Sequence, residues 1–120
     1  MISRFQRFGS IETENGLANA MVCMDADRPT EMMLHFYGDK IKPGAVLAEC
    51  TREENRIYLI PRLLFRPGEN GGLNLPSLTD QEVRAMTNTQ AVIEEKDGSW
   101  EGVWSTTEGQ TGRIHFPELR

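Results

Sequence analysis

The sequence predicts an all-β protein with about eight antiparallel strands and one short helix, folded as a small barrel or a strongly curved sandwich. Three observations support this fold class. Short runs of alternating apolar residues recur along the chain, and Gly-, Pro- and Asn-containing turn signals separate them. Only one segment carries the start signal of a helix. The length of 120 residues suits one core, so we expect residues 1–120 to form a single β-rich domain.

The expected strands are the apolar-alternating runs between these turn signals. They span residues 3–12, 17–24, 31–37, 45–51, 56–65, 90–96, 99–106 and 111–116. Pro61 interrupts the fifth run, and proline has no amide hydrogen to donate to a neighbouring strand. We therefore expect an edge strand or a β-bulge at this position.

The expected helix spans residues 80–87. Thr79 can cap its first turn while Glu82 reaches back to the cap, which is a capping box. Leu78 and Val83 would form a hydrophobic staple around the same turn. Since a helix of about two turns is marginal alone, it must dock on the sheet.

The segment from residue 97 to residue 116 predicts the register of three strands. Asp97-Gly98 is a type I′ turn signal, and Thr107-Glu108-Gly109 suits a three-residue loop with Gly109 in the left-handed bulge position. One face then collects the apolar residues of the segment: Ala91, Ile93, Trp100, Gly102, Trp104, Ile114 and Phe116. A slip of one residue would scatter this set over both faces, so we interpret the two tryptophans first as core residues.

The triplet Gly102-Val103-Trp104 resembles the Gly-x-Trp motif of lipocalin- and avidin-like barrels. The resemblance covers about twenty residues near the C-terminus of this chain, whereas the lipocalin motif lies near the start of the barrel. By this analogy the fold would be calycin-like. Closed eight-stranded barrels can leave an interior that holds one small ligand.

Composition excludes several classes of function. The formal net charge is −5, so a nucleic-acid groove has no electrostatic support. No apolar run approaches the roughly 18 residues of a membrane helix, and the N-terminal segment lacks the pattern of a signal peptide. Cys23 and Cys50 lie in apolar-patterned segments without metal-binding spacing, and we expect them to be reduced thiols in the core. We expect a cytoplasmic protein that binds neither nucleic acid nor membrane and holds no cofactor or metal.

The leading functional hypothesis is a non-catalytic binding module that holds a small, partly apolar ligand in a barrel or sheet pocket. The candidate ligand-binding residues are the aromatic and imidazole side chains nearest the predicted pocket: Trp100, Trp104, His35, Tyr37 and Tyr58. For His35 the first interpretation is a buried, hydrogen-bonded position in the core, and a position in the pocket is the alternative. Arg62 and Arg66 can bind a carboxylate or a phosphate, or form ion pairs on the surface or at an interface.

The alternative hypothesis is a protein-interaction domain that forms a homodimer and takes no small-molecule ligand. The segment "RIYLIPRLLFRP" carries apolar residues on both faces of one strand, and the outer face of an antiparallel sheet must then be covered. A second copy of the chain is the commonest cover. We expect Leu59, Leu63 or Phe65 near the centre of that interface.

An enzyme of unknown type is the third hypothesis, and the sequence leans against it. No nucleophile motif is present, and neither cysteine has a histidine at a diagnostic spacing, so no catalytic residue is assigned. In the predicted register Glu94 faces Glu101, and Glu101 faces His115. This row could be an acid–base pair, half of a metal site, or a solvated outer face.

Overall fold

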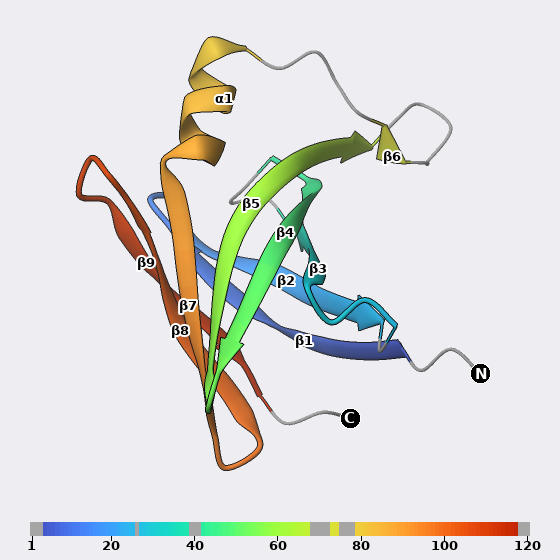
Figure 1. Cartoon of the computed structure of the whole chain (residues 1–120). Coiled ribbons are helices and arrows are strands. Elements are labelled where there is room, and N and C mark those ends of the chain that lie inside the picture. The colour runs from blue at the N-terminus through green and yellow to red at the C-terminus, as the bar shows by residue number, and fades with distance from the viewer. Residues whose placement is uncertain (1–3, 26, 39–41, 68–72, 75–78, 118–120) are drawn as a thin grey trace.

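The computed structural model describes residues 4–25, 27–38, 42–67, 73–74 and 79–117, and within them the chain forms a closed, all-antiparallel barrel (Figure 1). The eight barrel strands are β1 (Arg4–Thr13), β2 (Gly16–Asp25), β3 (Glu31–Tyr37), β4 (Gly44–Glu53), β5 (Arg56–Pro67), β7 (Thr89–Lys96), β8 (Ser99–Thr106) and β9 (Thr111–Phe116). Each strand pairs with the next along the chain, and β9 returns to β1. The two-residue β6 (Leu73–Asn74) pairs with β5, and α1 (Asp80–Thr87) leads into β7. The predicted fold class is confirmed, in its barrel form.

The observed strands begin and end within two residues of the expected ones. The turn residues have the backbone angles that their types require, with φ of 51° at Asp97, 86° at Gly98 and 92° at Gly109. The register of the C-terminal strands is the predicted one, with Trp100 opposite Phe116 and Trp104 opposite Gly112. Local turn chemistry therefore determines how β7, β8 and β9 pair.

The capping box at the start of α1 is also confirmed. The hydroxyl of Thr79 accepts a hydrogen bond from the Glu82 amide at 3.1 Å, and the Glu82 carboxylate accepts one from the Thr79 amide at 3.2 Å. Leu78, one half of the expected staple, lies outside the described residues. The helix lies against β5. A helix of this length is not stable alone and needs such a contact. None of the helices in the described part of the chain is long and apolar enough to cross a membrane.

The predicted irregularity at Pro61 is a β-bulge. Leu47 faces Leu63 while Ala48 faces Pro61, so Arg62 is the extra residue on β5. On its other side β5 pairs with β7 only from Arg56 to Leu59. Beyond that point β5 arches away from β7, and α1 stands above the start of β7 (Figure 1). One end of the barrel is therefore open between β5 and β7.

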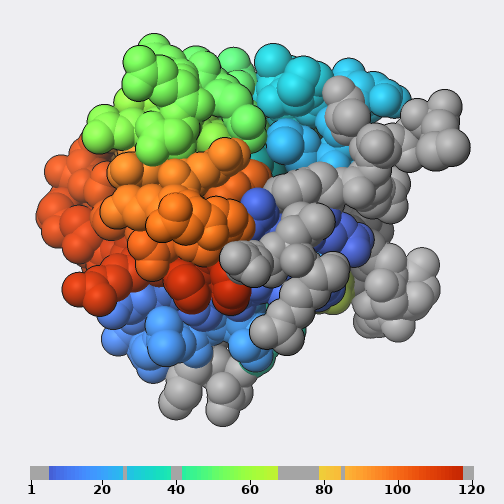
Figure 2. All heavy atoms as spheres, turned by 90° about the horizontal axis from the view of Figure 1, so that it is seen from below, coloured from blue at the N-terminus to red at the C-terminus, as the bar shows by residue number. Residues whose placement is uncertain are grey.

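The opposite end, which we call the closed half, is filled by side chains. It is bounded by the β4–β5 and β7–β8 turns, and seen from below its described atoms form a continuous surface over β4, β5 and β7–β9 (Figure 2). Its interior residues are all buried: Val22, Met32, Cys50, Ile57, Ile93, Trp100 and Phe116. An ion pair of 3.2 Å joins Arg52 to Glu95, and the Glu95 amide donates to the Asn55 carbonyl at 2.8 Å. These contacts link the two turns across the end of the barrel.

Arg7 and Trp100 form the centre of the closed half. The guanidinium carbon of Arg7 lies 4.6 Å from the centroid of the Trp100 ring. At that distance the cation is attracted by the negative face of the indole. Arg7 also donates to the carbonyls of Gly98 at 2.6 Å and Pro117 at 3.2 Å. The side chain thereby connects β1 to the β7–β8 turn and to the end of β9.

Both cysteines are free thiols, as expected from the sequence, but Cys23 on β2 is only partly buried and lies outside the core that was expected to hold it. Cys50 belongs to the core, and burial raises the pKa of its thiol to about 11. Because the thiolate is the reactive form, Cys50 is inert at neutral pH in the folded protein.

Candidate functional site

The half of the barrel beneath α1, which we call the open half, contains a cavity of about 940 Å³ that opens to solvent. Its deepest lining residues are apolar and at most 8% exposed: Ile11, Leu34, Ala48, Leu59, Leu64 and Ile114. We call these six residues the floor of the cavity. No polar or charged side chain is buried among the described residues, so the floor offers a ligand no hydrogen-bond partner from a side chain.

Trp104 forms one wall of this cavity and is only partly buried. Its indole nitrogen donates to the Glu12 carbonyl at 2.8 Å, across the junction between β9 and β1. The ladder of that junction is short, since only Ser10 with His115 and Ile11 with Ile114 pair across it. Trp104 therefore continues the closure of the barrel where the ladder ends, and its one polar group is already used.

The close approach of Trp104 to β1 depends on Gly112, which lies opposite it on β9. A Cβ atom at position 112 would fall against the indole nitrogen of Trp104 and the carbonyl of Glu12. We expect Gly112→Ala to displace the indole, to break its hydrogen bond and to lower the free energy of unfolding by about 1–3 kcal/mol. Urea denaturation and the tryptophan emission maximum measure this. Thr111→Ala, an exposed neighbour on β9, is the control and should leave both unchanged.

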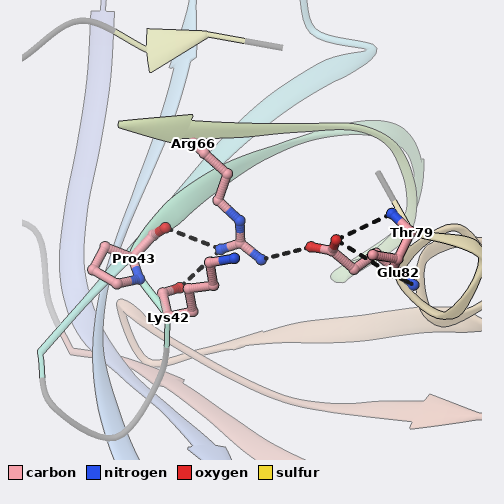
Figure 3. A network of polar contacts seen from close by, with 5 residues as sticks. All are labelled: Lys42, Pro43, Arg66, Thr79 and Glu82. Carbon is pink, nitrogen blue, oxygen red and sulfur yellow. Dashed lines mark hydrogen bonds and ion pairs between the residues drawn. The ribbon is translucent and has the colours of Figure 1, made fainter. Parts of the chain in front are cut away.

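A polar network centred on Arg66 lies at the mouth of the cavity (Figure 3). One terminal nitrogen of Arg66 donates to the carbonyls of Lys42 at 3.0 Å and Pro43 at 2.9 Å. The other lies 3.3 Å from the Glu82 carboxylate. The network joins the segment before β4, the end of β5 and the first turn of α1, so it holds the helix at the mouth.

The Glu82 carboxylate is stabilised in its charged form. The hydrogen bond from the Thr79 amide, and next the contact with Arg66, lower the pKa of Glu82 below its ordinary value of 4.5. The stability that this carboxylate contributes is therefore complete above pH 4.5 and is lost as the pH falls through its lowered value in the folded state. At neutral pH the ion pair with Arg66 is intact.

The structure separates the five candidate ligand-binding residues. Trp104 lines the cavity, whereas Trp100 lies in the closed half at 2% exposure. His35 and Tyr37 alternate along β3 with the cavity residues Leu34 and Phe36, so they lie on the outer face of the barrel. Tyr58 also lies on the outer face, next to Arg56. Burial lowers the pKa of His35, which keeps its imidazole neutral at physiological pH.

Several cavity residues were not assigned to a site from the sequence. The residues of β3 that line the cavity are Leu34 and Phe36, and the strand is apolar on both faces, so its alternation does not indicate which face is inside. Met86 lines the mouth from α1. Its place in the last turn of the predicted helix was the available signal, because a short helix docks through its apolar side.

The row of acidic and imidazole side chains on the outer face has the predicted pairing, with Glu94 opposite Glu101 and Glu101 opposite His115. The imidazole nitrogen of His115 lies 3.5 Å from the Glu101 carboxylate, and both side chains are about half exposed. Across the described ranges, no group of three or more His, Cys, Asp or Glu side chains could hold a metal ion.

Comparison of the chain with protein-family models, with curated proteins and with solved structures gives no match.

Proposed function

We propose that the protein is a binding module that holds a small, partly apolar ligand in the open half of its barrel. The observation that carries the proposal is the cavity of about 940 Å³ above an apolar floor. Ligand pockets typically enclose about 300–1,000 Å³ and combine apolar walls with a few polar groups at fixed positions. Here the polar groups are gathered at the mouth, where Arg66 and Glu82 form an ion pair.

Binding would be driven by burial of apolar surface. Trp104, Phe36 and Val46 line the cavity and are each only partly buried without a ligand. Each square ångström of apolar surface removed from water stabilises the complex by about 25 cal/mol. An apolar group placed among these side chains therefore gains free energy without requiring a hydrogen bond.

Titration with small apolar and amphipathic compounds tests the proposal. We expect a bound compound to change Trp104 emission and to raise the melting temperature. Val46→Phe, which places a larger side chain in the cavity, should weaken binding by about tenfold or more through a steric clash. Val103→Phe makes the same change on the exposed outer face of β8 and should bind as the wild type does. Equal binding by both variants, or no binding by any protein, would contradict the cavity as the site.

A homodimeric assembly domain is the second candidate, and an apolar outer face favours it. Phe8 is 59% exposed, Ile60 44% and Leu63 41%. The strand pairing connects the outer residues of β1 to β5 into one row: Phe8, Met21, His35, Ala45 and Phe65. Ala45 is fully buried within this row, so the exposed apolar side chains lie on β1 and on β5. Exposed apolar patches are typical of interaction surfaces. Leu59 lies in the floor of the cavity, so an interface on this face would be built around Leu63 and Phe65.

We expect the wild-type protein to have a mass near twice 13.6 kDa by light scattering at micromolar concentration. Leu63→Asp should reduce the mass to that of one chain without unfolding it, because Leu63 is exposed in the single chain. The exposed Val103→Asp on β8 is the matched control. A single-chain mass for the wild type would exclude the dimer and leave the ligand proposal standing.

We also infer a cytoplasmic location, which the two free cysteines support.

A further inference from the structure

We propose that the ligand is a single-chain carboxylic acid, with its hydrocarbon chain on the floor of the cavity and its carboxylate at Lys42, beside the Arg66–Glu82 ion pair. This inference rests on the proposed function, because it requires the cavity to be the binding site. It adds the chemical class of the ligand and the direction in which the ligand lies.

The floor requires a hydrocarbon at the inner end. All six floor residues are apolar, and the indole nitrogen of Trp104 already donates to Glu12. A hydroxyl, amide or charged group placed on the floor would lose its bonds to water and gain none from these side chains. Any polar group of the ligand must therefore lie at the mouth.

The mouth is positively charged on the side formed by β5, α1 and the segment before β4. Lys42 and Arg66 supply two cations there, and Glu82 supplies one carboxylate. The Lys42 side chain extends beside the Arg66 guanidinium toward Glu82 (Figure 3), and its charge contributes to the lowered pKa of Glu82. The terminal nitrogens of Arg66 are occupied by Glu82 and two carbonyls, so among the described residues on this side the charge of exposed Lys42 is left over.

Two other carboxylates line the mouth, those of Glu12 and Glu14, near the β1–β2 turn. The Glu12 carboxylate accepts a hydrogen bond from the Arg113 amide at 3.2 Å, on β9. Among the described residues the charge at the mouth is therefore divided, with cations in excess beside α1 and carboxylates beside the β1–β2 turn. A head group with one negative charge complements the first side, whereas an ammonium head group would add a third cation there.

Three probes with the same hydrocarbon chain separate the head group from the chain: dodecanoate, dodecanol and dodecylamine. At neutral pH dodecanoate carries a negative charge, dodecanol carries no charge and dodecylamine carries a positive charge. We expect dodecanoate to bind the wild type about three- to tenfold more tightly than dodecanol, and dodecylamine to bind most weakly. Tryptophan emission and the melting temperature measure each titration.

Lys42→Glu is expected to weaken dodecanoate binding about tenfold, to strengthen dodecylamine binding and to leave dodecanol unchanged. Lys42→Gln, which removes the charge only, should give an intermediate result for dodecanoate. Lys96→Glu is the matched control, because it makes the same change of net charge at the exposed β7–β8 turn of the closed half. It should leave the binding of all three probes as in the wild type.

The outcomes separate this inference from the proposed function. If dodecanol binds as tightly as dodecanoate, or if dodecylamine binds most tightly, the carboxylate assignment is overturned while the cavity remains the binding site. Equal effects of Lys42→Glu and Lys96→Glu would also overturn it, because the charge would then act only at long range. Failure of all three probes to bind would reject both the inference and the proposed function.

Discussion

Replacing Trp100 with alanine is expected to lower the free energy of unfolding by about 3–5 kcal/mol. Trp100 is one of the largest fully buried side chains, at 2% exposure, and it lies opposite Phe116 in the closed half of the barrel. Its removal leaves a cavity that the surrounding strands cannot collapse to fill, because β7, β8 and β9 are held in register by tight turns. Arg7 also loses the ring that faces its guanidinium.

Chemical denaturation of Trp100→Ala and Trp100→Phe tests this prediction. Phenylalanine keeps a ring for Arg7 and fills more of the space, so Trp100→Phe should be clearly less destabilising than Trp100→Ala. Val103→Ala, on the exposed face of the same strand, should change stability by less than about 0.5 kcal/mol. If Trp100→Ala were as stable as Val103→Ala, the closed half would not be the core of the protein.

The fold was predictable from sequence where local chemistry determines it. Asp97-Gly98 and Thr107-Glu108-Gly109 each allow few backbone conformations, so they fix which residues of β7, β8 and β9 face each other. The capping box of Thr79 and Glu82 fixes the start of α1 in the same way. These features need only neighbouring residues, and a single sequence contains all of them.

The depth of a residue within the barrel was not predictable in this way. Trp100 and Trp104 share one face of β8, as expected, but one fills the closed half and the other lines the cavity. That difference arises from the closure of β9 onto β1 and from the departure of β5 from β7, and both join segments far apart in the sequence. Alternation along a strand identifies its inner face, but it does not indicate how much of the interior is filled.

The bulge on β5 changes which residues of this apolar strand face the interior. Before the bulge, Ile57 and Leu59 point into the barrel, and after it Leu64 and Arg66 line the cavity. The extra residue, Arg62, shifts the alternation by one position. One set of apolar residues on β5 therefore packs in the interior, whereas Leu63 and Phe65 lie on the outer face. Pro61 indicated a bulge in the sequence, but the residue that it would add could not be assigned.

Gly102→Val is expected to destabilise the protein by about 1–3 kcal/mol through overpacking. Gly102 lies between Trp100 and Trp104 on β8, opposite Ile93 on β7 and Ile114 on β9. A Cβ atom at position 102 would fall against the Val92 carbonyl and 2.9 Å from the Ile93 Cα, closer than side-chain carbons approach a backbone. Because β7 and β8 are joined by a two-residue turn, they cannot separate without losing their ladder.

The Gly102→Ala variant tests the close approach of β8 to the backbone of β7 by itself. Gly102→Ala adds only the Cβ atom, yet that atom already meets the backbone of β7, so the alanine variant should also be destabilised. The valine variant adds two methyl groups in a face that holds buried Ile93 and Ile114, and it should be less stable still. The urea midpoints of the two variants and the wild type measure the order. An alanine variant as stable as the wild type would contradict the close approach of β7 and β8 at this position. In that case free space would remain between Trp100 and Trp104, and the cavity would extend from the open half toward the closed half.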